Sequence, residues 1–310
     1  MEFEADLQRV WSPGRPVDVA ALLGQHRRGR GDPTHLDDAG GRHWRASRTP
    51  EGPVSLMIVD QDAAGAVTAR AWGPGSKWAM GQLPALLGER DDWSGFEPRH
   101  RVLAEIRRRL PHLRRGRTDR LFEAIVPAVL EQKVTVQEAF AGFRNLVRTY
   151  GVAAPGPAPS GLLLQPDAAT LVGLASWEWL RIGVDPARSR TVVQLARRVR
   201  ALERLEEIGE AGSEVERRLR SLPGVGVWTS AEVRQRAFGD PDAVSFGDYH
   251  VAKDVGWALE GAVFDDQQLS DYLRPWRGHR GRVPFLLAAA GLRRPRRGPR
   301  SAPRRHGRSA

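Results

Sequence analysis

The chain has 310 residues, a formal net charge of +11 and no cysteine. This length accommodates two domains with a sizeable core. The lack of cysteine excludes disulfides, a thiol nucleophile and cysteine-ligated zinc or iron–sulfur clusters. The positive charge favours a polyanionic partner such as a nucleic acid.

The sequence shows no sign of a membrane span or a resident cofactor. It has no run of about 18 apolar residues, and its first six residues are too acidic for a signal peptide. The eight histidines form no recognisable metal-binding pair. We therefore expect a cytoplasmic, nucleoid-associated protein that uses no metal and no redox cofactor.

Residues 1–95 are predicted to form a mixed α/β module. Its expected elements, separated by Gly, Pro and Asp turns, are a helix over 17–23, strands over 43–47, 54–59 and 66–72, and a helix over 77–87. The acidic stretch 91–95 marks the expected domain boundary. No catalytic constellation is visible in this module.

Residues 96–292 have helical periodicity and predict an all-α domain of eight to ten helices. The expected helices are 102–110, one or two within 121–150, then 167–174, 189–205, 214–222, 229–237, 248–260, 266–274 and 280–290. A Pro/Gly-rich loop is expected at 154–161. The fold class is therefore α+β, with the mixed module preceding the helical domain.

Residues 293–310 form an arginine-rich tail with eight arginines and no acidic residue. Such a segment has little apolar surface to bury, so we expect disorder. It either tethers the protein nonspecifically to DNA or is a solvated tail without a function.

A glycine hairpin is the first candidate functional motif. Residues 222–229 read Leu-Pro-Gly-Val-Gly-Val-Trp-Thr, between two predicted helices. Gly224 and Gly226 permit a tight turn and close backbone approach. Val225 is expected to pack between the helices. The amides leading to Thr229 can bind a DNA phosphate. The alternative is an ordinary helix–helix turn.

Asp248 is the second candidate, 20 positions after Trp228. It precedes a predicted helix, where aspartate is a favoured N-cap. A carboxylate at a fixed distance from a phosphate-binding hairpin can also act on the bound nucleic acid. The two roles are compatible.

Four segments in this order support a family resemblance: 130–136, 222–229, Asp248 with Tyr249, and 274–277. Together they resemble the helix-hairpin-helix glycosylase motif of the HhH-GPD DNA repair superfamily, in particular its AlkA-like 3-methyladenine DNA glycosylase II branch. The resemblance covers about residues 120–290, and the N-terminal module resembles that branch more weakly.

This resemblance implies base excision repair of damaged double-stranded DNA. An alkylated purine such as 3-methyladenine is flipped out of the duplex, and Asp248 stabilises the cationic sugar while the N-glycosidic bond breaks. Trp228 stands where lyase members carry a Schiff-base lysine. The resemblance therefore implies a monofunctional glycosylase without AP-lyase activity.

The resemblance also implies roles for other residues. Trp228 and Phe285 would hold the base, and Gln132 and Lys133 would fill the duplex where the base leaves. Glu232 replaces an expected aromatic residue, and would either favour a cationic base or face solvent. A monovalent cation is an optional ligand of the hairpin, and we expect a monomer.

Two alternatives stay open at this stage. One is a non-catalytic helix-hairpin-helix DNA-binding protein that uses the hairpin and the basic tail. The other is a glycosylase for bulky adducts or crosslinks, because Lys133, Phe285 and Glu232 depart from the family pattern. A cluster of arginines over 107–120 either lines DNA or is a solvated helix face.

Overall fold

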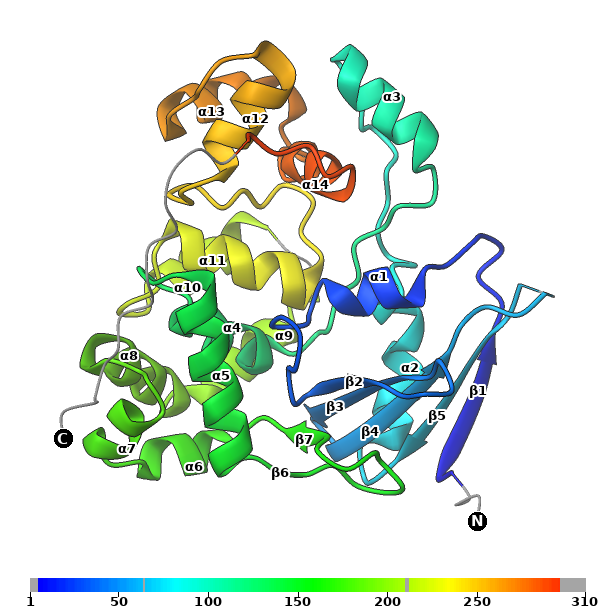
Figure 1. Ribbon diagram of the computed structural model, residues 1–310, viewed down its shortest axis with the longest axis vertical. Helices are drawn as coiled ribbons and strands as arrows, with labels where there is room; N and C mark the ends of the chain where they lie inside the picture. The colour runs from blue at the N-terminus through cyan, green and yellow to red at the C-terminus, as the bar shows by residue number, and fades with distance from the viewer. Residues whose placement is uncertain (1–4, 64, 210–211, 296–310) are drawn as a thin grey trace.

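The computed structural model describes residues 5–63, 65–209 and 212–295 and has an α+β architecture, as predicted (Figure 1). A sheet is built from the first 72 residues, and helices form most of the rest. Most of the arginine-rich tail, from residue 296 on, lies outside the described residues, and so does the prediction made for it. No helix within the described ranges is long and apolar enough to cross a membrane.

The N-terminal sheet has five antiparallel strands in the order β1-β5-β4-β3-β2. The strands are β1 Leu7–Trp11, β2 His35–Asp37, β3 His43–Thr49, β4 Gly52–Val59 and β5 Val67–Trp72. One face packs against α1 (Val19–Gly24) and α2 (Ser76–Leu86) through a common apolar core. The predicted strands β3 to β5 are confirmed, whereas β1 and β2 were not predicted.

The other face of the sheet is covered by a small hairpin from the later part of the chain. Strands β6 (Val152–Ala153) and β7 (Leu163–Leu164) pair antiparallel around the predicted Pro/Gly loop. Leu164 packs with Trp44 and Trp72, whose rings stack at 5.4 Å. The expectation of an all-α region after residue 96 is therefore wrong here, because this loop closes a hairpin that the sheet needs as a cover.

The region after residue 96 contains more helices than the expected eight to ten. Its twelve described α-helices are α3 Arg101–Arg109, α4 Leu121–Leu130, α5 Val136–Tyr150, α6 Ala168–Gly173, α7 Ser176–Arg181, α8 Pro186–Ala196, α9 Val199–Glu206, α10 Ser213–Arg220, α11 Val227–Val233, α12 Val251–Glu260, α13 Asp266–Tyr272 and α14 Arg282–Ala289. The excess arises because the segment predicted as 189–205 divides into α8 and α9, and because α7 was not predicted.

These helices form two layers with separate cores. The lower layer in Figure 1 combines α4 to α11 around residues such as Ile125 and Leu146. The upper layer combines α3 with α12, α13 and α14 around Leu103 and Leu286. α11 lies at the top of the lower layer and continues as a π-helix, η1 Arg234–Phe238. The predicted site residues lie where these layers meet.

Candidate active site

The glycine hairpin connects α10 to α11. The structure requires a glycine at Gly224 but would accommodate a side chain at Gly226. Gly224 has a φ of +81°, and a Cβ there would lie 2.6 Å from the Thr191 side chain. Gly226 has an extended backbone with φ −87°, and among the described residues no atom lies within 4 Å of its Cβ position. Gly224 therefore serves the fold, whereas Gly226 leaves open space beside the hairpin backbone.

The other two hairpin residues predicted to bind DNA have buried side chains. Val225 belongs to the core of the lower layer, at 4% exposure, which confirms its predicted packing between the helices. Thr229 is 2% exposed, and its hydroxyl accepts a hydrogen bond from Gln132 at 2.8 Å. Neither side chain is therefore free to contact DNA, and the Val225 N–H already donates to the Leu222 carbonyl at 3.1 Å.

The turn between α4 and α5 lies against this hairpin. The Gln132 amide donates to the Gly224 carbonyl at 2.9 Å as well as to Thr229. Lys133 is exposed and has a left-handed φ of 55°, a conformation that non-glycine residues adopt uncommonly. The structure thus brings both residues to the hairpin, with the Lys133 side chain at the tip of an adjoining turn.

Trp228 and Asp248 are in direct contact. The indole Nε1 donates to Asp248 Oδ2 at 3.3 Å. The other oxygen, Oδ1, accepts from the backbone N–H groups of His250 and Val251 at 2.7 and 3.2 Å, where α12 begins. Both side chains are half-buried. Asp248 therefore lies just before the N-cap residue of α12, His250, and its second oxygen is held beside an indole ring.

Glu232 follows Trp228 by one turn and does not face solvent freely. One carboxylate oxygen pairs with Arg236 at 2.6 Å, and the other accepts from Ser245 Oγ at 2.5 Å. Burial opposes the charge of Glu232, but Arg236 and Ser245 outweigh it and hold the pKa of this carboxyl below its ordinary value. Glu232 lies in the site region, but its charge is already balanced.

Phe285, which is also half-buried, has a cation against its ring. The Arg115 guanidinium is 4.3 Å from the ring centroid. Arg115 Nη1 also donates to Gln235 Oε1 at 3.1 Å, and Gln235 Nε2 donates to Ser245 Oγ at 3.1 Å. A continuous series of contacts therefore leads from Asp248 and its neighbours to Phe285.

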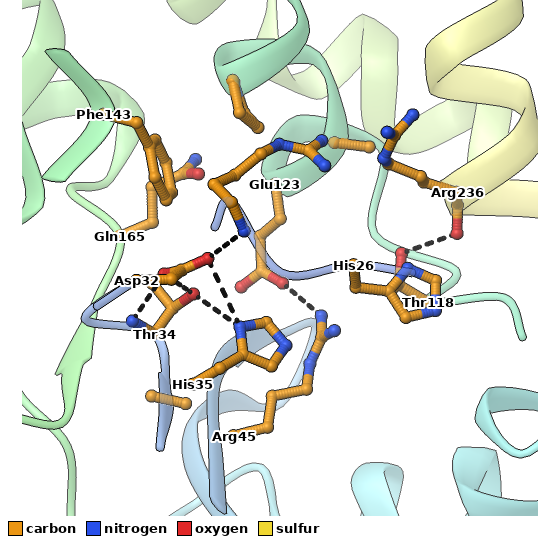
Figure 2. A pocket seen from close by; sticks show the side chains of 14 residues that line it. His26, Asp32, Thr34, His35, Arg45, Thr118, Glu123, Phe143, Gln165 and Arg236 are labelled. Carbon is orange, nitrogen blue, oxygen red and sulfur yellow. Dashed lines mark hydrogen bonds and ion pairs between the residues drawn. The ribbon is translucent and has the colours of Figure 1, made fainter. Parts of the chain in front are cut away.

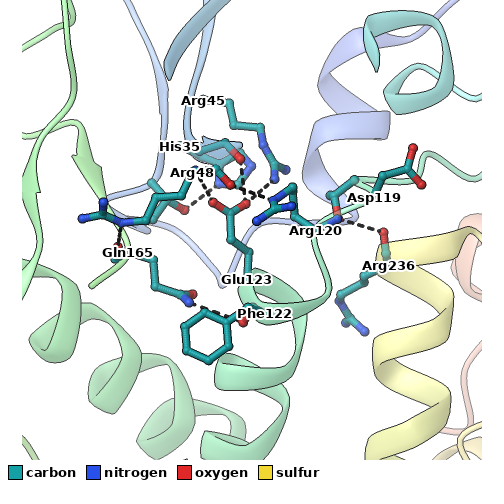
Figure 3. Close-up of polar contacts among 12 residues, drawn as sticks. His35, Arg45, Arg48, Asp119, Arg120, Phe122, Glu123, Gln165 and Arg236 are labelled. Atoms are coloured by element: carbon teal, nitrogen blue, oxygen red, sulfur yellow. Dashed lines mark hydrogen bonds and ion pairs between the residues drawn. The ribbon is translucent and has the colours of Figure 1, made fainter. Parts of the chain in front are cut away.

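A second buried polar cluster joins the sheet to the helices. Glu123 in α4 accepts from Arg45 at 3.0 Å, from the Ser47 hydroxyl at 2.8 Å and from the Arg48 backbone at 2.6 Å (Figure 3). Glu123 thus fixes the start of α4 to strand β3. Gln132 lies in the turn just after the other end of this helix, which ends at Leu130.

The same cluster borders a small cavity of about 30 Å³, room for only a few water molecules. His26, Asp32, His35, Arg45 and Arg236 line it (Figure 2). His26 is 8% exposed, and burial together with nearby cations holds its pKa well below the ordinary value. The cavity is too small for a base. Among the described residues, no group of three or more His, Asp or Glu side chains is arranged to hold a metal ion.

No family model matches the chain. Its curated relatives include the probable bifunctional transcriptional activator/DNA repair enzyme AlkA of two Mycobacterium tuberculosis strains. The two sequences are 31% identical over 163 residues. The matched segment covers 51% of this chain and 31% of the relative. The chain therefore spans about a third of the length of the curated relatives it matches, at 31%.

Solved structures match nearly the whole chain. The 3-methyladenine DNA-glycosylase from Archaeoglobus fulgidus has a TM-score of 0.72 at 19% identity, covering 91% of this chain and 98% of that one. The apo 8-oxoguanine glycosylase/lyase of Clostridium acetobutylicum has a TM-score of 0.66 at 12% identity, covering 92% and 99%. The chain has the fold of the HhH-GPD DNA glycosylases. The AlkA-like resemblance inferred from the sequence is confirmed.

Within this glycosylase fold, sequence reasoning missed three residues next to the predicted ones: Arg115, Gln235 and Ser245. Gln235 follows Trp228 and Glu232 by seven and three positions, so helical spacing alone places it on the same face. Arg115 belongs to the arginine cluster that the sequence left as DNA-lining or solvated. In the structure it is half-buried, and neighbouring Arg117 and Arg120 are buried at 8% and 6% exposure.

Proposed function

We propose that this chain is a monofunctional DNA glycosylase that flips alkylated purines, such as 3-methyladenine, out of duplex DNA and hydrolyses their N-glycosidic bond. The pairing of Trp228 with Asp248 at 3.3 Å carries this proposal. The relatives named above as DNA repair enzyme AlkA and 3-methyladenine DNA-glycosylase support the substrate class. The biological role would be base excision repair.

The chemistry requires stabilisation of a positive charge that develops on the sugar. Asp248 Oδ1 is held by two backbone N–H groups, which leaves Oδ2 directed toward Trp228. A carboxylate fixed in this way needs little reorganisation when the oxocarbenium-like sugar forms, and in a water-poor site it also orients the attacking water. The flipped base would lie against the half-buried Trp228 ring.

The absence of lyase activity is part of the proposal. A lyase reaction proceeds through a Schiff base on an amine nucleophile, and an indole has no nucleophilic amine. Trp228 occupies the hairpin position at which the family's lyases carry that lysine. The product would therefore be an intact abasic site.

The DNA contacts follow from the hairpin. The backbone from Gly224 to Thr229 would bind a phosphate, with open space at Gly226, and a monovalent cation could support it from the protein side. Lys133 and Gln132 would enter the duplex at the abasic position. We propose that the chain binds damaged double-stranded DNA as a monomer.

The test is base release from methylated duplex DNA by the wild type, Asp248→Asn and Asp265→Asn, before and after alkaline treatment. Asp265 is the N-cap of α13 and accepts from Gln268 N at 2.8 Å. Like Asp248, it bonds backbone amides at the start of a helix, so it controls for loss of such a carboxylate. We expect release by the wild type and Asp265→Asn, at least a hundredfold less by Asp248→Asn, and strand breaks only after alkali.

Several outcomes would change the assignment. DNA binding without release by the wild type would support a non-catalytic DNA-binding protein. Release of bulky adducts but not methylated purines would move the substrate class. Strand breaks before alkali would refute the monofunctional reaction.

A further inference from the structure

Asp248 closes a short turn that begins at Ser245. The Asp248 N–H donates to the Ser245 carbonyl at 3.1 Å, and Gly247, the third residue of the turn, has a left-handed φ of +86°. A glycine with such a φ at the third position is typical of a type II β-turn, whose shape is fixed. The location of Ser245 therefore sets where the Asp248 backbone lies.

The Ser245 hydroxyl joins this turn to the helix that carries Trp228. Ser245 is 5% exposed. Its Oγ accepts from Gln235 Nε2 at 3.1 Å and donates to Glu232 Oε1 at 2.5 Å. Glu232 and Gln235 follow Trp228 by four and seven positions, so the three share one face of α11 and its continuation η1. The turn that carries Asp248 is thus attached to the face that presents Trp228.

The donors and acceptors around this hydroxyl permit one arrangement. Arg115 and Arg236 can only donate, and the Glu232 carboxylate can only accept. The Gln235 carbonyl oxygen accepts from Arg115 Nη1 at 3.1 Å, which directs its amide nitrogen to Ser245. Ser245 Oγ therefore receives a hydrogen from Gln235 and gives its own to Glu232. The other Glu232 oxygen is held by Arg236 at 2.6 Å, so the hydroxyl is bonded in a single orientation.

Other contacts of the same segment lie nearer to solvent. Gly247 N donates to the exposed Asp266 at 3.0 Å, and His250 N, which donates to Asp248 Oδ1 at 2.7 Å, is also in an exposed position. A hydrogen bond shielded from water is electrostatically stronger than an exposed one. Ser245 therefore supplies the buried attachment of the segment.

We propose that Ser245 is a positioning residue, whose hydroxyl holds the turn against α11 so that Asp248 Oδ2 meets the Trp228 indole at 3.3 Å. This inference rests on the proposed glycosylase function. It gives Glu232 a role other than contact with a base, because Glu232 anchors Ser245 and acts on the site through the turn. A misplacement of about 1 Å in a reacting group can lower a rate about a hundredfold, so one hydroxyl at this point affects catalysis.

The test measures single-turnover base release from methylated duplex DNA by the wild type, Ser245→Ala, Ser245→Thr and Ser55→Ala. Ser245→Ala removes the hydroxyl, and Ser245→Thr keeps one. Ser55 is the matched control, since it is fully buried and its hydroxyl donates to the Pro155 carbonyl at 2.5 Å, but it lies in strand β4 of the sheet. The affinity for a duplex with an abasic site is measured in parallel.

Ser245→Ala should lower the rate constant of excision about tenfold or more and leave the affinity within about twofold. Ser245→Thr should recover most of the rate, and Ser55→Ala should change neither quantity by more than about twofold. Adding Ser245→Ala to Asp248→Asn should cost nothing further, because the hydroxyl acts through that carboxylate. Losses that multiply with Asp248→Asn, or an equal loss in Ser55→Ala, would overturn the inference.

A second variant covers the case in which Ser245→Ala does not fold. Gln235→Met has a side chain of similar length and lacks the amide that donates to Ser245 at 3.1 Å. It should lower the excision rate constant in the same way, and an unchanged rate in this variant would count against the inference.

A spectroscopic measurement separates this inference from the proposed function. The Trp228 indole N–H resonance, identified among those of the ten tryptophans by its loss in Trp228→Phe, reports the hydrogen bond to Asp248 without DNA. Ser245→Ala should move it in the direction in which Asp248→Asn moves it, and Ser55→Ala should not. If the wild type releases no base while the resonance moves in this way, the proposed function fails and the positioning role holds. If base is released and Ser245→Ala changes neither the rate nor the resonance, the reverse is true.

Discussion

The two hairpin glycines allow a matched pair of substitutions that separates fold from function. Gly224→Ala places a methyl group on a residue with φ +81°, 2.6 Å from Thr191 Cγ2 and Oγ1. Gly226→Ala places the same methyl group on an extended residue with φ −87°, with no described atom within 4 Å. The chemical change is identical, and only its surroundings differ.

The expected magnitudes follow from these surroundings. A left-handed alanine costs about 1–2 kcal/mol, and crowding in a packed region adds on the order of 1 kcal/mol. Gly224→Ala should therefore lower the free energy of unfolding by about 2–3 kcal/mol. Gly226→Ala should change it by only about 0.5 kcal/mol, the difference between glycine and alanine at an N-cap.

Urea denaturation measures both values, and a third variant separates the two contributions. Adding Thr191→Ala to Gly224→Ala should recover the crowding part and leave the backbone part. If the hairpin amides bind phosphate, Gly226→Ala should weaken DNA binding at unchanged stability. Equal destabilisation by both alanines, or a loss under about 1 kcal/mol for Gly224→Ala, would refute this reasoning.

Two further predictions concern buried carboxylates. Glu123→Gln leaves Arg45 buried without its charge partner, so urea denaturation should show that the free energy of unfolding falls by about 3 kcal/mol. The control Glu105→Gln, which breaks an exposed ion pair, should lower it by under about 0.5 kcal/mol. A similar loss in both variants would contradict this prediction. Burial raises the pKa of Glu206 from 4.5 to about 7, so the folded state binds this proton more tightly than the unfolded state. Its contribution to stability should therefore fall as pH rises from about 4.5 to about 7, by about 2 kcal/mol between pH 5 and pH 7.5. Glu206→Gln should remove this slope, and an equal slope in both proteins would exclude Glu206 as its source.

Much of the fold could be predicted because its signals are local. Strand β4 is mostly apolar and is separated from β3 and β5 by Gly, Pro and Asp turns. Helix α5 begins with a capping box at Thr135. β2 has only three residues, and β1 carries exposed Leu7 and Val10 on an edge strand. Neither has the periodicity on which a prediction rests.

The candidate site was predicted only in part, for a similar reason. The hairpin and Asp248 are short motifs at a fixed spacing, and the structure brings Trp228 and Asp248 together. Arg115 meets Gln235 across 120 positions, and Glu123 meets Arg45 across 78. An arginine in a charged run has the same local sequence whether it is solvated or buried, so only the tertiary structure distinguishes the two.

The position of α3 has a consequence for how the chain folds. This helix buries Leu103 and Ile106 against the upper layer, although on the order of 140 residues separate Arg109 from Val251 at the start of α12. During synthesis, α3 is therefore complete long before the helices it packs against, and the helices of the lower layer are made in between. The upper layer closes last, since its contacts have high sequence separation. Because Phe285 packs in this layer, the proposed site would be completed only when the layer closes.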